Sequence, residues 1–211
     1  MTGLTASDLS FSYGGTPILQ GWSAEFPAGS TTAMTGRSGH GKSTALYLLG
    51  LMLQPAAGEV ILDGVPVSGL PDAAKARLRA HHYGFVFQDA ALDPTRTVID
   101  NVRETALYRG LHRKAVTTRA HELLDRFDVV VPPHRRPGQI SGGQAQRVAL
   151  CRALLSEPPI LLADEPTGNL DAASSRVVMD ALRDHAATGA TVVVVTHSLE
   201  VADACDRRLA L

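Results

Sequence analysis

The stretch Gly36-Arg37-Ser38-Gly39-His40-Gly41-Lys42-Ser43 decides the fold, because it matches the pattern G-x-x-x-x-G-K-[ST]. Residues 31–35 before it predict a short strand, and the residues from Lys42 onward predict a helix. Glycines at such a turn leave backbone N–H groups open to an anion, and the helix N-terminus adds partial positive charge at the same point. The stretch therefore predicts a phosphate-binding loop.

The loop pattern also predicts what individual side chains do. Lys42 is expected to reach the β- and γ-phosphates of a nucleotide, and the Ser43 hydroxyl is expected to ligate Mg²⁺. No role is assigned to the His40 side chain. The residues expected to contact the nucleotide here are Gly36, Arg37, Ser38, Gly39, His40, Gly41, Lys42, Ser43 and Thr44.

Length and composition limit the class of protein. The 211 residues suit one domain or a large domain with an inserted lobe, and 45% of them are hydrophobic. The formal net charge of −1 gives no basic field for nucleic acid. Cys151 and Cys205 lack metal-ligand spacing and are expected to be small hydrophobes in a reducing compartment. The N-terminus has no secretory signal, and the longest apolar run, at residues 45–53, is too short to cross a bilayer. A cytoplasmic protein is therefore predicted.

Polar residues follow several predicted strands at their carboxyl ends. Besides strands at 4–11 and 18–26 and a hairpin at 60–67, we predict short apolar strands at 84–87, 160–163 and 191–195. In an open parallel sheet, ligands bind at the carboxyl edge of the strands. The residues expected to meet at that edge are Gln88, Asp164, Glu165 and His197.

Chemistry suggests separate roles for these polar groups. Asp164, at the strand end, is expected to hold Mg²⁺ together with Ser43. Glu165 is expected to orient or deprotonate the attacking water. His197 is expected to contact the γ-phosphate. The alternatives are that Asp164-Glu165 is a charge pair at a helix N-terminus and that His197 is a hydrogen-bonded histidine of the core.

Helical spacing dominates the middle of the chain. A helix is predicted from 71–72 to Leu78, helical periodicity runs from about 98 to 127, and 128–139 is a Pro-rich basic connector. Ser141 and Gln144 have capping-box spacing and open a helix that ends at Glu157-Pro158-Pro159. A further helix is predicted at 174–185. We therefore predict a helical lobe at about 90–140, inserted into a core made of about 1–89 and 141–211.

These motifs together resemble the nucleotide-binding subunit of an ATP-binding-cassette (ABC) transporter over nearly the whole chain. Ile140-Ser141-Gly142-Gly143-Gln144 resembles the family signature, with Ile in place of Leu. Phe87-Gln88 resembles its Q-loop and Leu170-Asp171 its D-loop, while His197 resembles its switch histidine. Tyr13 stands where the family stacks an aromatic ring on adenine, and Phe11 is a rival for that role.

The resemblance implies an α/β fold and an ATPase activity. The implied fold is a single ABC ATPase domain over 1–211, with a P-loop NTPase core of mainly parallel sheet, an N-terminal antiparallel β-subdomain and the inserted helical subdomain. The implied cofactors are ATP and Mg²⁺. Gln88 is implied to contact the metal and to serve catalysis together with Lys42, Glu165 and His197. The implied partner is a second copy, bound head to tail, whose ATP is covered by Ser141, Gly142, Gly143, Gln144 and Asp171.

The segment 163–171, Ala-Asp-Glu-Pro-Thr-Gly-Asn-Leu-Asp, resembles the macrolide-exporter and lipoprotein-transporter group, as do 85–88 and 97–102. This predicts export or extraction of a hydrophobic compound, peptide or lipid through separate integral-membrane permease subunits, with the chain peripheral on the inner face of the cell membrane. Its helical lobe would receive their coupling helices. The sequence departs from relatives at Asp93, where an apolar residue is common, and no C-terminal regulatory extension is expected.

Three alternatives share the same catalytic residues. The chain could serve an importer, which differs in its membrane partner. It could be a regulatory ATPase that signals across the membrane to cell-wall hydrolases. It could also be an ABC ATPase acting on DNA or ribosomes, although the sequence contains no coiled-coil insertion, tandem cassette or basic patch.

Overall fold

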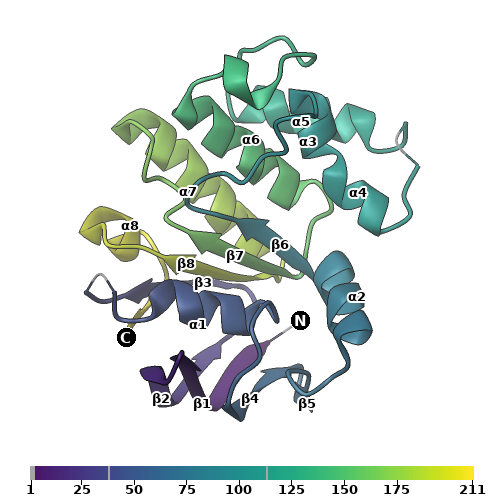
Figure 1. Cartoon of the computed structure of the whole chain (residues 1–211). Coiled ribbons are helices and arrows are strands. Elements are labelled where there is room, and N and C mark those ends of the chain that lie inside the picture. Colours follow the sequence, from purple (N-terminus) through teal and green to yellow (C-terminus); the bar gives the residue numbers. More distant parts are fainter. Residues whose placement is uncertain (1–2, 38, 113) are drawn as a thin grey trace.

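A computed structural model describes residues 3–37, 39–112 and 114–211. These residues form three layers (Figure 1). A parallel sheet lies in the middle, helix α1 (Lys42–Leu49) and an antiparallel sheet lie below it, and most of the other helices lie above it. Both sheets agree with the α/β class expected from the sequence.

The antiparallel sheet has the strand order β2-β1-β4-β5. Its hairpin turns at Asp63 (φ 51°) and Gly64 (φ 79°), which are the two positive φ angles of a tight turn. The expected N-terminal strands and the hairpin are thus confirmed. The strands are β1 (Leu4–Tyr13), β2 (Thr16–Phe26), β4 (Ala57–Leu62) and β5 (Val65–Pro66).

The parallel sheet has the strand order β6-β7-β8-β3-β9, and every neighbouring pair in it is parallel. The carboxyl ends of β3, β6, β7 and β8 therefore point to one edge of the sheet. The strands are β3 (Ser30–Thr35), β6 (Tyr83–Val86), β7 (Ile160–Asp164), β8 (Thr191–Val195) and β9 (Arg207–Ala210).

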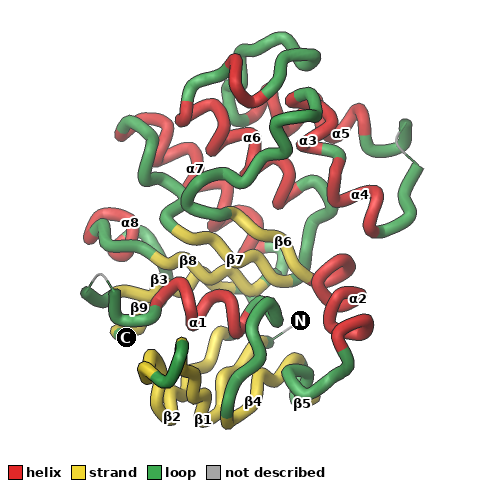
Figure 2. Tube along the Cα trace, in the orientation of Figure 1, coloured by secondary structure: helices red, strands yellow, loops and turns green. Residues whose placement is uncertain are grey.

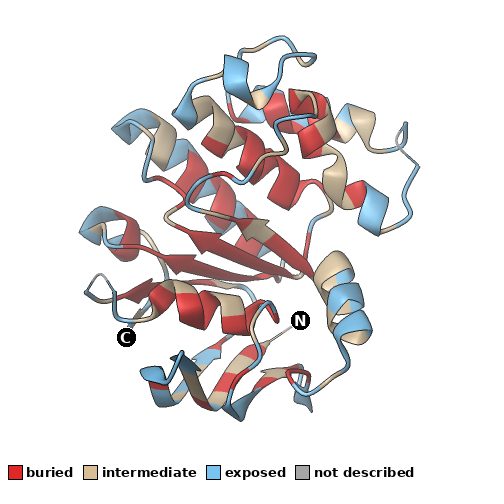
Figure 3. Ribbon diagram, viewed as in Figure 1, coloured by how far each residue is buried: buried red, intermediate tan, exposed pale blue. Residues whose placement is uncertain are grey.

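Alternate residues of β7 face two separate hydrophobic cores. Ile160 and Leu162 pack in a cluster with α1 and the antiparallel sheet, whereas Leu161 and Ala163 pack in a cluster with the helices above. Figure 3 shows the resulting band of buried residues through the middle of the molecule. Burial on both faces explains why the strand is apolar throughout instead of alternating with polar residues.

The helices include three short ones between Val98 and Arg126, where the sequence predicted helical structure. Figure 2 shows the loop that leads from β6 to the first of them. The helices beyond α1 are α2 (Asp72–His82), α3 (Val98–Val102), α4 (Glu104–Tyr108), α5 (Thr117–Arg126), α6 (Gly142–Leu154), α7 (Ala172–Ala187) and α8 (Leu199–Asp203), with a 3₁₀ turn at Pro137–Gln139.

Two predicted helix boundaries were wrong by a few residues. Helix α2 continues past Leu78 because the Arg109 guanidinium donates hydrogen bonds to the carbonyl oxygens of Ala80 and His81 in its last turn. Helix α7 begins two residues before Ser174 because the Asp171 carboxylate caps its first turn. Both errors arise from side-chain bonds that apolar periodicity does not reveal.

Candidate active site

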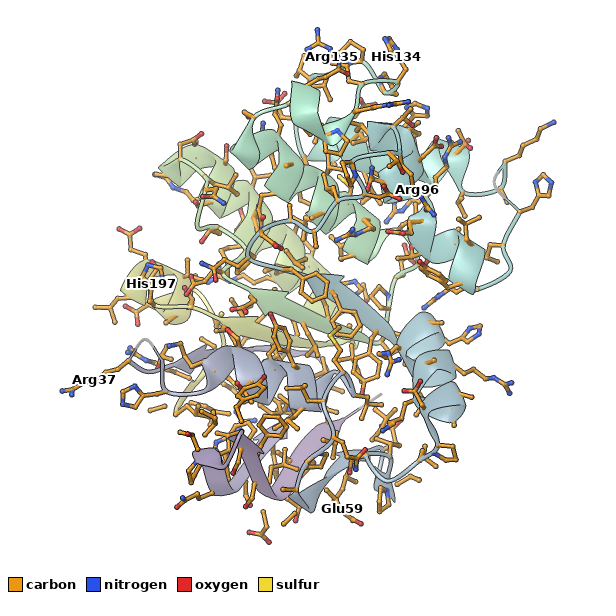
Figure 4. All side chains as sticks on the ribbon, in the orientation of Figure 1. Arg37, Glu59, Arg96, His134, Arg135 and His197 are labelled. Atoms are coloured by element: carbon orange, nitrogen blue, oxygen red, sulfur yellow. The ribbon has the colours of Figure 1, made fainter. Side chains whose placement is uncertain are left out.

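A cleft of about 560 Å³ lies at the carboxyl edge of the parallel sheet. It brings together residues of the phosphate loop and the start of α1, Gln88 shortly after β6, the end of β7, and Val195 and His197 at the end of β8. The side of the molecule on which it opens carries His197 and Arg37 in Figure 4. Its lining residues are Ile18, Gly39, Gly41, Lys42, Ser43, Thr44, Gln88, Asp164, Glu165, Val195 and His197.

Gly41 and Lys42 form the junction between the phosphate loop and α1. Gly41 has φ 86°, and a Cβ there would meet Ile18 Cγ2 at 2.7 Å, so only glycine fits. Among the described residues no side chain caps the N-terminus of α1, which leaves its N–H groups directed toward the cleft. The Lys42 ammonium donates to the carbonyl oxygens of Gly36 and Arg37, each at 2.9 Å. The loop thus offers an anion both backbone dipoles and a cation.

Other predicted loop residues do not line the cleft. Gly36 packs so closely that a Cβ would stand 2.5 Å from the carbonyl oxygen of Leu211. Arg37 and His40 are exposed, and the backbone N–H of His40 donates to the Arg37 carbonyl oxygen. The prediction for Ser38 falls outside the described residues.

Asp164 and Ser43 supply oxygen atoms for a cation. Asp164 is the last residue of β7 and is 2% exposed, and its carboxylate hydrogen-bonds to the Ser43 side chain. Burial raises the pKa of Asp164, and the bond from Ser43 and the charge of Lys42 oppose that rise. Placing a cation beside this buried carboxylate would offset its desolvation.

The donor set fits Mg²⁺ bound with a nucleotide. Among the described residues no group of three or more His, Cys, Asp or Glu side chains could hold a metal ion on its own. Mg²⁺ takes oxygen ligands and usually combines one or two carboxylates with substrate phosphates and water. Ser43, Asp164 and the Gln88 amide at the same cleft match that requirement.

Glu165 and His197 form a close pair. Glu165 Oε1 lies 2.7 Å from His197 Nδ1 and accepts the His197 backbone N–H at 2.9 Å. Thr196 Oγ1 donates to the other carboxylate oxygen at 3.2 Å. The Glu165 side chain is 11% exposed and the His197 side chain 78% exposed. The carboxylate is therefore fixed at the cleft wall, while most of the imidazole faces solvent.

Tyr13, Ser141–Gln144 and Asp171 lie outside the cleft of their own chain. The Tyr13 ring is half-exposed and meets Phe11 edge to face, with ring centroids 4.8 Å apart. Ser141 and Gln144 form a reciprocal capping box at the start of α6, as expected. Asp171 Oδ1 accepts the Ser174 N–H at 2.8 Å. The adenine contact of Tyr13 remains a prediction about this chain's own nucleotide. The nucleotide contacts of Ser141, Gly142, Gly143, Gln144 and Asp171 remain predictions about nucleotide bound by a second copy.

Three further residues at or beside the cleft, Ile18, Val195 and Thr196, were not predicted from the sequence. Ile18 fills the space beside Gly41, Val195 accepts the Glu165 N–H through its carbonyl oxygen, and Thr196 holds the Glu165 carboxylate. Of the three, only Thr196 could have been predicted as a site residue, because it is a polar residue directly after a buried strand and before His197.

Comparison with known proteins agrees with this geometry. A family model described as "ABC transporter" matches residues 19–168. The lipoprotein-releasing system ATP-binding protein LolD of Nitrobacter hamburgensis is 42% identical over 195 residues, covering 92% of this chain and 84% of LolD. The macrolide export ATP-binding/permease protein MacB 2 of Aeromonas hydrophila subsp. hydrophila is 42% identical over 87% of this chain and 28% of its own length. The dimeric ATP-binding cassette MJ0796, in a post-hydrolysis state bound to ADP and Pi, has 32% identity and a TM-score of 0.90, covering 99% of this chain and 94% of its own.

Proposed function

The chain belongs to the ABC transporter family, and from that premise we propose that it is the ATP-hydrolysing subunit of a transporter that exports or extracts a hydrophobic compound, peptide or lipid. The observation that carries the proposal is the meeting of Lys42, Ser43, Asp164 and Glu165 in one cleft. The similarity to LolD and MacB supports the choice of export or extraction.

Each group in the cleft has a proposed part in binding or hydrolysing ATP. The loop N–H groups and Lys42 bind the phosphates, and Tyr13 stacks on the adenine. Ser43, Asp164 and Gln88 hold Mg²⁺, which would neutralise charge on the β- and γ-phosphates. Glu165 accepts a proton from the attacking water, and His197 contacts the γ-phosphate. Buried Thr196 fixes one oxygen of the Glu165 carboxylate and leaves the other at the His197 side.

A second copy completes the site in this proposal. The α6 N-terminus is a second anion-binding helix end, and it lies away from the cleft of its own chain. A head-to-tail dimer would place Ser141, Gly142, Gly143, Gln144 and Asp171 against nucleotide held by the other phosphate loop. The dimeric MJ0796 cassette supports this arrangement.

A hollow of about 770 Å³ between α2, β6 and α4 offers a surface for the permease. Aromatic side chains of Tyr83, Phe85, Phe87 and Tyr108 line it. We propose that a cytoplasmic segment of the membrane subunit occupies this hollow. MacB 2, which is named as both ATP-binding and permease protein, supports a membrane-embedded partner for a chain of this kind.

Location and domain organisation follow from the same proposal. Within the described ranges, no helix combines the length and apolarity needed to cross a bilayer. We propose that the chain binds the cytoplasmic face of the cell membrane through its permease. We further propose that it is one domain, with a helical subdomain at about 90–140 that extends into α6 and a core made of about 1–89 and 141–211.

The concentration dependence of ATP hydrolysis tests the proposal. We expect Mg²⁺-dependent phosphate release whose rate per molecule rises with protein concentration, because two copies form each site. Ser141→Arg should bind ATP as the wild-type monomer does and lose hydrolysis, whereas Ser23→Arg, at an exposed position of strand β2, should retain it. A rate per molecule independent of concentration would contradict the shared site.

The membrane partner needs its own experiment. Co-expression with the membrane protein encoded beside this chain should yield a complex whose ATPase rate differs from that of the chain alone. Tyr108→Ala changes a residue that lines the aromatic hollow and is 63% exposed, so it should weaken the complex. Val130→Ala is the control, because Val130 is 79% exposed and lies outside the hollow, and it should leave the complex unchanged. Equal binding by both variants would place the permease elsewhere.

A further inference from the structure

A buried guanidinium holds the loop that follows Gln88. Arg152 lies on α6 and its side chain is 8% exposed. Its two terminal nitrogens donate to the carbonyl oxygens of Ala91 at 2.7 Å and Ala90 at 2.9 Å. Glu104 lies 3.6 Å from the same group and supplies a counter-charge. A planar fork that meets two adjacent carbonyl groups fixes the course of the backbone between them.

The two residues held in this way have an unfavourable backbone conformation. Ala90 has φ 61° and Ala91 has φ 44°, so two consecutive alanines lie in the left-handed region. A side chain with a Cβ is disfavoured there, and such conformations persist only where surrounding contacts hold them. The hydrogen bonds from Arg152 are those contacts for the carbonyl groups of both residues.

The ends of the same loop are also fixed by buried amides. Gln146, on α6 and 2% exposed, donates to the Phe87 carbonyl oxygen at 3.2 Å. Asn101, fully buried on α3, accepts the Asp93 N–H at 2.8 Å and donates to the Asp93 carbonyl oxygen at 3.1 Å. Gln88, which lines the nucleotide cleft, therefore lies in a segment held at both ends and in its middle.

We propose that Arg152 is a positioning residue. By holding the left-handed turn at Ala90 and Ala91, it fixes the course of residues 87–93 and so directs Gln88 to the nucleotide cleft. Because Arg152 lies on the helix that begins at Ser141, it links the second anion-binding helix end to Gln88. Arg152 and Ala91 also line the hollow proposed for the permease. The inference rests on the proposed function for the part that Gln88 plays.

Amide hydrogen exchange tests the positioning role without any nucleotide. In the wild type, the Ala90 N–H donates to Phe87 and the Asp93 N–H donates to Asn101, so both are protected. Arg152→Gln should raise the exchange of residues 87–93 at least tenfold. Arg147→Gln is the matched control, because Arg147 lies on the same helix and donates to Ser174 instead. Unchanged exchange at 87–93 in Arg152→Gln would overturn the proposal.

A double-mutant cycle with Gln88 separates positioning from general destabilisation. Arg152→Gln should raise the Mg²⁺ concentration for half-maximal ATPase activity about as much as Gln88→Ala does, while nucleotide affinity stays unchanged. In the Gln88→Ala background it should add less than twofold, since the residue it positions is gone. If the two substitutions instead raised the required Mg²⁺ concentration by independent factors that multiply in the double mutant, the inference would be overturned. A wild type without ATPase activity would instead contradict the proposed function.

Two further variants keep the test informative if Arg152→Gln does not fold. Arg152→Lys keeps the charge but cannot donate to both carbonyls from a planar fork, so it should give an intermediate Mg²⁺ requirement. Ala90→Gly with Ala91→Gly removes the penalty of the left-handed turn and should restore most of the Arg152→Lys loss. Failure of the glycines to restore it would show that Arg152 does not act through this turn.

Discussion

Glu165 and His197 lie on neighbouring strand ends, and one carboxylate oxygen of Glu165 meets both the backbone N–H and the Nδ1 of His197, at 2.9 and 2.7 Å. The two residues come from segments separated by helix α7 and strand β8. The parallel pairing of β7 with β8, which sets Asp164 opposite Val195, brings them together. A carboxylate held by a backbone donor keeps one orientation whether or not the imidazole moves, which suits a proton acceptor.

We expect Glu165→Gln to bind ATP and hydrolyse it about 10²–10⁴-fold more slowly, since an amide cannot accept the proton of the attacking water. The ATP-bound dimer should then accumulate and be visible by size-exclusion chromatography. Glu59→Gln is the control, because Glu59 is exposed at the bottom of the molecule in Figure 4, away from His197, and does not line the cleft. Phosphate release at the wild-type rate in Glu165→Gln would remove Glu165 as the base.

Thr196→Val should weaken catalysis through Glu165 without affecting nucleotide binding. The buried hydroxyl donates to the carboxylate, and losing a hydrogen bond worth about 1 kcal/mol predicts a fall in kcat of roughly fivefold. Thr32→Val is a matched control on β3, because the Thr32 hydroxyl is buried with no hydrogen-bond partner among the described residues. Equal effects of the two substitutions on kcat would refute a role for Thr196.

Lys42→Ala should reduce ATP affinity. The ammonium now donates to the Gly36 and Arg37 carbonyl oxygens and would exchange these for phosphate oxygens. Hydrogen bonds to charged groups contribute about 1.5–3 kcal/mol, so Kd should rise roughly 10- to 100-fold. Titration with a fluorescent ATP analogue measures this. Lys75→Ala is the control, because Lys75 is a half-buried residue of α2 whose ammonium donates to Gln54 outside the cleft. An unchanged Kd would exclude Lys42 from the phosphate site.

Asp164→Asn should abolish Mg²⁺-dependent hydrolysis and yet stabilise the nucleotide-free protein by roughly 0.5–2 kcal/mol at pH 7. Burial raises the pKa of Asp164 in the folded state, so its ionisation favours the unfolded chain. The stabilisation should therefore disappear as the pH falls below the ordinary Asp pKa of about 3.9, where both states are protonated. Denaturant unfolding at several pH values measures it. The same gain in Asp125→Asn, at an exposed position, would contradict this cause.

The sequence could predict the cleft because its groups sit at the carboxyl ends of apolar strands. Gly41, Asp164 and His197 each follow or end a strand whose burial on both faces made it recognisable. The parallel pairing of β7 with β8 and of β8 with β3 then brings these three residues to one edge of the sheet. The fold class followed from the same feature.

The fixation of Gln88 could not be predicted in this way. Arg152 and Asn101 are polar residues on otherwise apolar helix faces, and both bind backbone carbonyl groups of this loop. Arg152 does so from 61 residues away in the sequence and Asn101 from eight. Alanine gives no local signal for a left-handed conformation, so the turn at Ala90 was invisible as well. Asp93, noted only as unusual, accepts two hydrogen bonds from Thr95, and these lower its pKa.

Because neighbouring residues of β7 belong to different cores, the chain cannot be divided into a working half. A fragment of residues 1–97 would contain the phosphate loop and Gln88 but lack β7 and β8. The side of β3 that pairs with β8, and the apolar face of α1 that packs on both strands, would then be open to water. Such a peptide should aggregate or stay unfolded, so a minimal nucleotide-binding version of this protein must keep β7 and β8, which lie in the second half of the sequence.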